Sequence, residues 1–222
     1  MKLQPKDEVV LDGISHTRCA LPETIQTFLE GDTLNAARKR AERMAADGFL
    51  ATSLLPSGRQ WFRHSKLGCK HTGSPACWSE SPPPGVIAEA LAAGAVMNIS
   101  GFKILRPADV ARFLRAAALD DSLAIPARVM ASRFVRTEEQ NGDLRLNYLL
   151  AEIRPAAKLE QRAETVLHQL GRIPVFNSLI NSDLFGLVIA VPTDGVRATL
   201  VVDKLAVPVR VIVVEEFRHL TL

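Results

Sequence analysis

Three consecutive prolines, Pro82, Pro83 and Pro84, divide the chain. Proline fixes φ and has no backbone N–H, so such a run can neither continue a helix nor pair inside a sheet. The run lies in a segment rich in Pro, Ser, Gly and Cys, residues 73–85, which we interpret as a stiff linker. The sequence therefore predicts two folded parts, residues 1–72 and residues 86–222.

The composition is typical of a folded protein: 47% of the 222 residues are hydrophobic and 23% are charged. A mostly disordered chain is excluded, because such chains lack enough apolar surface to bury. Apolar stretches such as residues 83–98 are shorter than the about 20 residues that a membrane-spanning helix needs. The first eight residues are polar and lead into no apolar signal-peptide core. We expect a cytoplasmic protein that does not contact membranes.

The net charge of +3 is unevenly distributed. Residues 33–73 contain eight basic and two acidic side chains, a net charge of +6, which leaves −3 for the rest of the chain. The basic residues are Arg38, Lys39, Arg40, Arg43, Arg59, Arg63, Lys66 and Lys70. Such segregation of charge is typical of proteins that bind a polyanion.

The pattern of the first part predicts three helices followed by a two-stranded hairpin. Helices are expected over residues 7–16, 22–29 and 34–47, and strands over residues 49–55 and 59–64. Thr33 can cap the third helix and Gly48 can end it. This order of elements is typical of a winged helix-turn-helix domain.

The third helix, residues 34–47, is predicted to read the major groove of double-stranded DNA. Its apolar stripe leaves Asn35, Arg38 and Lys39 on the opposite face. Arginine can bond both major-groove acceptors of guanine, and asparagine can bond adenine in the same bidentate way. Arg40 and Arg43 flank this face and are expected to contact phosphates, which position a protein without reading sequence.

The hairpin, residues 49–64, is predicted to contact the DNA backbone or the minor groove. Arg59 and Arg63 alternate with Trp61 on one face of its second strand. Two further residues are predicted to contact DNA: Thr33, which caps the third helix, and Lys66, which lies just after the hairpin. A run of basic residues on a helix is more often a solvated face. Here the run coincides with a capped third helix and a basic hairpin, which favours DNA binding.

The second part predicts a small mixed α/β domain for dimerisation or for contact with a partner. The expected helices cover residues 86–97, 107–118, 156–170, 175–180 and 194–205, and the expected strands cover residues 133–138, 143–153, 185–191 and 207–214. Asn141-Gly142 is a strong hairpin signal between the first two strands. The last two strands are continuous apolar runs joined by a helix, a pattern typical of buried parallel strands. No convergent polar group in this part marks a ligand pocket.

The chain ends with the pattern Phe-x-x-x-x-Ala-Val-Pro-Thr-x-x-x-Arg-Ala, a helix and Val-Pro-Val-Arg-Val. On residues 185–190, Thr193, Arg197 and Ala198, together with residues 33–49, it resembles the replication-relaxation and mobilisation accessory proteins of plasmids and integrative elements. The resemblance implies a double-stranded DNA-binding protein that controls transcription, replication or conjugative transfer, with other proteins of the mobile element as partners. It carries over no catalytic motif.

The order of elements in the second part also resembles the core of metal-dependent nucleases of the restriction-endonuclease type. Those enzymes need an Asp followed by (Asp/Glu)-x-Lys on the next strand. The nearest match is Glu152-x-Arg154 with Asp143 upstream. Arginine cannot serve as a base, and Asp143 lies on the same predicted strand as Glu152. We therefore assign no catalytic residue and no cofactor. A degenerate core of this type stays open as an interpretation, and an active metal-dependent nuclease stays open as an alternative function.

His64, Cys69, His71 and Cys77 are a candidate zinc set, since thiolate and imidazole are zinc ligands. Their spacing lacks the Cys-x2-Cys pair of common zinc sites, so ordinary thiols are favoured.

Two linked half-sites would strengthen DNA binding, which favours a homodimer. A regulator whose second part senses a small ligand is a further alternative.

Overall fold

The chain forms two units, each built around its own β-sheet, in a mixed α/β fold. A computed structural model describes residues 3–29, 31–55, 57–73, 84–105, 107–126, 129, 133–139, 142–151, 153 and 156–220. The first unit comprises Met1–Asn98 and Glu216–Leu222, and the second comprises Ile99–Glu215. The predicted α/β class is confirmed. None of the described helices combines the length and the apolar composition needed to cross a membrane.

The first unit contains the three predicted helices and the predicted hairpin. Its elements are α1 (Pro5–Thr17), β1 (Cys19–Ala20), α2 (Pro22–Phe28), α3 (Leu34–Ala46), β2 (Leu50–Leu54), β3 (Gln60–His64), α4 (Lys66–Thr72) and α5 (Pro84–Met97). The strands form an antiparallel sheet in the order β1-β3-β2. The 3-10 helix η1 (Glu215–His219) brings the end of the chain back to this unit.

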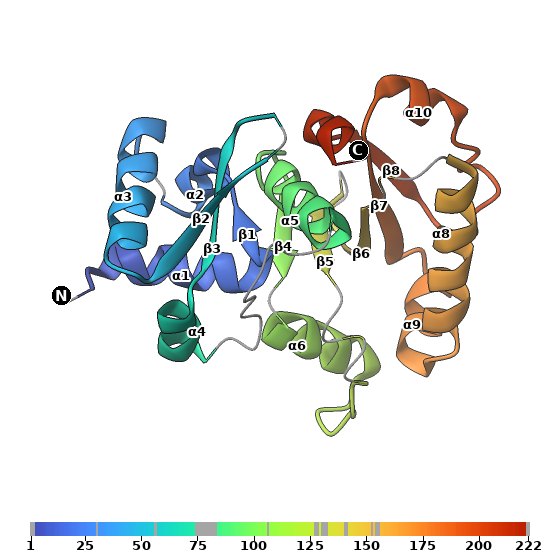
Figure 1. Cartoon of the computed structure of the whole chain (residues 1–222). Helices are drawn as coiled ribbons and strands as arrows, with labels where there is room; N and C mark the ends of the chain where they lie inside the picture. The colour runs from blue at the N-terminus through green and yellow to red at the C-terminus, as the bar shows by residue number, and fades with distance from the viewer. Residues whose placement is uncertain are drawn as a thin grey trace. The chain divides into compact units, whose positions relative to one another are not determined.

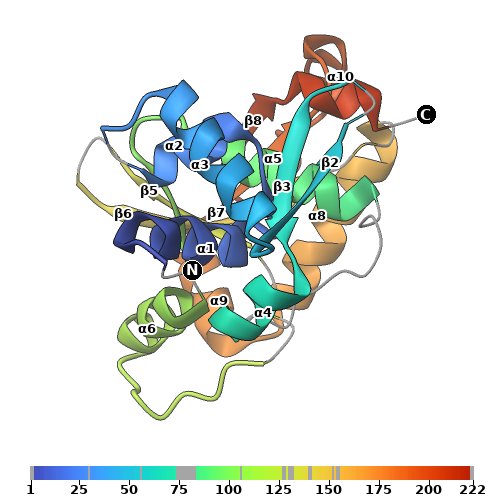
Figure 2. The ribbon, with the colours of Figure 1, turned by 60° about the vertical axis from the view of Figure 1, so that its left-hand side comes forward.

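Helix α3 begins and ends where its sequence predicts. The Thr33 hydroxyl accepts a hydrogen bond from the Ala36 amide at 3.2 Å, and Gly48 follows with a φ of +81°. Ala37, Ala41 and Met44 are buried on one face of α3, in a core shared with α1, α2 and the sheet. Figure 2 shows α3 between α2 and the β2–β3 hairpin. The opposite face of α3 is exposed.

The hairpin forms in the expected place, but the face of its second strand that was expected to contact DNA is partly buried. Because β1 pairs with the outer side of β3, β3 is the central strand of the sheet. Phe62 and His64 are buried on one face, and Trp61, expected beside exposed arginines, is only 2% exposed. Arg63 therefore lies within the sheet, opposite Cys19 and Ala51, and not beside the hairpin turn.

The chain divides at a different place from the predicted one. Helix α5 was expected in the second part, but it packs against α1, β1 and α2, and the boundary falls after Asn98. A Cβ on Gly94 would lie 2.4 Å from the Thr24 hydroxyl oxygen, so α5 and α2 are closely packed. An alanine-rich, apolar helix can be buried by either part, and its sequence does not specify which. Of the predicted linker, residues 74–83 lie outside the described residues.

The second unit is a five-stranded mixed sheet with helices on one face. Its elements are β4 (Phe102–Leu105), α6 (Pro107–Ala118), β5 (Phe134–Glu138), β6 (Leu144–Ala151), α8 (Ala156–Gly171), α9 (Pro174–Asn181), β7 (Phe185–Val191), α10 (Asp194–Thr199) and β8 (Val209–Val213). The sheet order is β4-β5-β6-β7-β8. The predicted antiparallel pair β5–β6 and the predicted parallel pair β7–β8 are both confirmed.

The core of the second unit lies between this sheet and helices α6, α8 and α9 (Figure 1). The rings of Phe134, Phe176 and Phe185 contact one another, with centroids 5.6–5.8 Å apart in successive pairs. Two details differ from the prediction. Strand β4 was not expected, and the helix expected over residues 194–205 ends at Thr199.

Candidate nucleic-acid interface

The exposed face of α3 carries three polar or basic side chains that the sequence predicted to contact DNA. Asn35, Arg38 and Lys39 are exposed, together with Glu42 one turn further along the helix. The Arg38 Nη2 donates to Asn35 Oδ1 at 3.3 Å, and its Nε lies 3.8 Å from Glu42 Oε1. The side chain of Arg38 is still 55% exposed. Exposed contacts of this kind contribute little, so the guanidinium remains available to a ligand.

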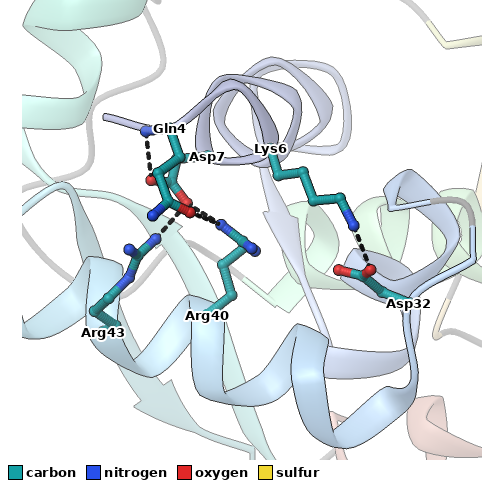
Figure 3. Close-up of polar contacts among 6 residues, drawn as sticks. All are labelled: Gln4, Lys6, Asp7, Asp32, Arg40 and Arg43. Carbon is teal, nitrogen blue, oxygen red and sulfur yellow. Dashed lines mark hydrogen bonds and ion pairs between the residues drawn. The ribbon is translucent and has the colours of Figure 1, made fainter. Parts of the chain in front are cut away.

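Helix α3 is fixed to α1 by a buried carboxylate. Asp7 is fully buried, and its Oδ1 accepts hydrogen bonds from Arg40 Nη1 at 2.6 Å and from Arg43 Nη2 (Figure 3). The other oxygen of Asp7 accepts a hydrogen bond from the backbone N–H of Gln4 at 2.8 Å. This bond is part of the cap at the start of α1. A buried charge is tolerated only when it is paired and hydrogen-bonded.

Arg40 and Arg43 have a different role from the predicted one, because both pair with Asp7. The sequence predicts phosphate contacts for both, whereas the structure directs both guanidiniums toward Asp7. Their side chains are 19% and 35% exposed. The spacing of three residues places both on one flank of α3, where α1 lies. They position α3 instead of extending its exposed basic face.

We predict that the substitution Asp7→Asn destabilises the first unit by about 3 kcal/mol, because it leaves two guanidiniums without their anion. The measurement is the free energy of unfolding in urea. The matched control is Asp12→Asn on the same helix: its carboxylate is 62% exposed and lies 3.5 Å from His16. The control should change stability by less than about 0.5 kcal/mol. Equal effects of the two substitutions would contradict the assigned role of Asp7.

At the hairpin, Arg59 is held by two carboxylates. Its Nη2 lies 2.9 Å from Glu23 Oε1 on α2, and its Nη1 pairs with Glu216 on η1. Arg59 also borders a groove of about 460 Å³ on the first unit. The groove is lined by Pro22, Glu23, Leu34, Asn35, Arg38, Glu42, Arg59 and Gln60. Three of the predicted DNA-binding residues, Asn35, Arg38 and Arg59, therefore lie around one groove.

The remaining predicted residues lie elsewhere. Thr33 is the exposed cap of α3, and Lys66 is exposed in the first turn of α4. Helix α4 was not predicted, although its sequence carries both end signals: Ser65 accepts from the Gly68 amide at 3.1 Å, and Gly73 has a φ of +67°. Arg63 lies on the central strand, as described above.

The positive charge of residues 33–73 is largely offset by acidic residues elsewhere in the first unit. Met1–Asn98 and Glu216–Leu222 together contain 12 basic and 11 acidic residues, a net charge of +1 for the first unit. Carboxylates from α1, α2 and η1, those of Asp7, Glu23 and Glu216, pair with the arginines of residues 33–73. The candidate interface is thus the exposed face of α3 and the adjoining groove.

The candidate zinc ligands do not converge in the described part of the chain. His64 is buried, and its Nε2 donates to the Leu11 carbonyl oxygen at 2.9 Å. His71 is exposed and lies 2.9 Å from a Glu8 carboxylate oxygen. Cys69 is buried, and Cys77 lies outside the described residues. Among described residues, no group of three His, Cys, Asp or Glu side chains is placed to hold a metal ion.

Burial lowers the pKa of the His64 imidazole below its ordinary value near 6.5, and the hydrogen bond to Leu11 opposes that shift. The unfolded chain therefore binds a proton at a pH where folded His64 stays neutral. We predict that the free energy of unfolding decreases as the pH falls below about 6.5, because His64 then binds a proton in the unfolded chain and not in the folded one. The measurement is the unfolding free energy of the wild type and of His64→Leu from pH 8 to pH 5. The wild type should lose more stability than the variant; parallel pH profiles would contradict this.

The second unit contains a polar depression that the sequence did not reveal. It has a volume of about 620 Å³ and lies over the amino-terminal ends of β6, β7 and β8. Buried Asn147 donates to Thr137 Oγ1 at 3.0 Å, and Arg145 Nη1 donates to Glu139 at 2.8 Å. The Arg210 guanidinium lies 4.8 Å from the centre of the Phe102 ring. The polar positions 145 and 147 of an otherwise apolar strand were the available signal.

Of the three nuclease-like residues, Asp143 alone lies in the described part of the chain. Asp143 is exposed and directly precedes β6, as expected for a carboxylate at a hairpin turn. Glu152 and Arg154 lie outside the described residues. Comparisons of the chain with protein-family models, with curated proteins and with solved structures found no match.

Proposed function

We propose that the protein is a double-stranded DNA-binding regulator and that its first unit is a winged helix-turn-helix domain. The observation that supports this most is the order α1-β1-α2-α3-β2-β3 with β1 paired to β3, combined with an exposed polar and basic face on α3. In this class of domain the third helix enters the major groove and its amino-terminal residues reach the base edges. Asn35 and Arg38 occupy that part of α3.

Three exposed residues of α3 then have a defined role. Arg38 bonds the two acceptors of a guanine, and Asn35 bonds an adenine. Lys39 contacts a phosphate, which adds affinity without sequence preference. The β2–β3 hairpin lies against the backbone or the minor groove. The Asp7 pairs with Arg40 and Arg43 support this proposal, because they fix the rotation of α3 about its own axis.

We propose that this regulator acts in the cytoplasm on a mobile genetic element, where it controls transcription, replication or conjugative transfer. The support is the resemblance carried by residues 33–49, by residues 185–190, and by Thr193, Arg197 and Ala198. Many winged-helix regulators bind two half-sites as dimers, since linkage of two weak contacts multiplies affinity. The proposed partners are a second copy of the chain and other proteins of the element.

We predict that Arg38→Ala reduces discrimination at one base pair by about 5- to 150-fold, the equivalent of one lost bidentate contact. The preferred duplex is first selected from a random pool with the wild-type chain. Binding of the variant to that duplex and to its single-base substitutions is then measured by fluorescence anisotropy.

The matched control is Arg112→Ala, which removes an arginine of the second unit whose side chain is 80% exposed and lies 3.5 Å from Asp109. It should bind like the wild type. Equal specificity of the Arg38→Ala variant and the wild type would refute the assigned role of α3. Absence of any binding at low salt would refute the DNA-binding function itself.

The polar depression of the second unit favours a second candidate function, a regulator that senses a small ligand. Arg145, Asn147 and Arg210 provide polar groups of the kind that orient a ligand in a concave site. A screen of metabolites by thermal denaturation tests this: a ligand that raises Tm for the wild type and not for Asn147→Leu would support it.

A further inference from the structure

The end of the chain packs onto the first unit, close to the hairpin. Helix η1 follows the last strand of the second unit, and its residues from Glu216 onward belong to the first unit. Phe217 is fully buried and Leu220 is nearly so. The Leu220 amide donates to the Phe217 carbonyl oxygen at 3.0 Å. We refer to residues 216–220 as the C-terminal segment.

The C-terminal segment holds the arginine nearest the hairpin turn. Glu216 pairs with Arg59 Nη1, while Glu23 lies 2.9 Å from Nη2 of the same guanidinium. Arg59 follows Gly58 of the turn and borders the groove that also contains Asn35 and Arg38. The one arginine of the hairpin that borders the interface is thus neutralised by two carboxylates.

We propose that the C-terminal segment restrains DNA binding by occupying Arg59 with Glu216. A phosphate and a carboxylate compete for the same donors of a guanidinium, since both accept in a bidentate way. The Nη1 side of Arg59 reaches a phosphate only after Glu216 has left it, while Glu23 can stay on Nη2. This inference rests on the proposed DNA-binding function.

The partial exposure of this ion pair makes exchange feasible. The side chains of Arg59 and Glu216 are 38% and 23% exposed, in contrast to the fully buried Asp7. Exposed pairs are weak and are screened by salt. The Asp7 pairs therefore persist as a structural element, whereas the Glu216 pair can open when DNA binds.

The test compares Glu216→Gln with the matched control Glu215→Gln in the full-length chain. Glutamine keeps the shape of the side chain and removes its charge. Glu215 is the neighbouring residue and is exposed. Binding of a short mixed-sequence duplex is measured by fluorescence anisotropy over a series of salt concentrations, and thermal denaturation checks that each variant is folded.

Glu216→Gln is expected to bind about two- to fivefold more tightly than the wild type, the range of one exposed ion pair. The slope of log K against log salt should steepen by about 0.9, because one more phosphate is neutralised. Glu215→Gln should match the wild type. Both effects of Glu216→Gln should disappear when Arg59→Gln is present as well, since the restraint acts through that guanidinium.

A wild-type chain that binds DNA, with no difference between Glu216→Gln and Glu215→Gln, would overturn the restraint and leave the proposed function intact. No binding by any variant would overturn both.

Discussion

The arrangement of the first unit depends on the carboxylate of Asp7. A fully buried charge is costly, and two guanidiniums from successive turns of α3 compensate it. Arg40 and Arg43 can reach one oxygen only when α3 lies along α1 in a single rotation about its axis. In that rotation Ala37, Ala41 and Met44 enter the core, while Asn35 and Arg38 face solvent. One ion-pair cluster thus determines which face of α3 can meet a ligand.

Local signals predicted most of the fold. The cap at Thr33, the glycine at Gly48 and the apolar spacing between them define α3, and the apolar runs near the end of the chain define β7 and β8. What failed depends on distant partners. Nothing near Arg40 in the sequence indicates that Asp7, 33 positions earlier, is its partner. Helix α5 is apolar on most sides, so its neighbours could not be inferred from its pattern.

The same limit applies to the charge of the candidate site. Counted along the sequence, residues 33–73 carry +6, but Asp7, Glu23 and Glu216 come from outside that segment and pair with its arginines. The candidate interface consequently comprises the exposed face of α3 and the groove beside it, without Arg40 and Arg43. Arg40 and Arg43 become positioning residues, and Arg59 becomes a residue whose availability depends on the C-terminal segment.

The proposed function requires that the first unit bind duplex DNA through α3. The most direct measurement is a two-dimensional NMR titration of the labelled chain with a short mixed-sequence duplex. If α3 enters the major groove, chemical-shift changes will concentrate on the amides of residues 33–42 and of the β2–β3 hairpin. No change at a saturating duplex concentration, or changes confined to residues 99–215, would contradict the proposed function.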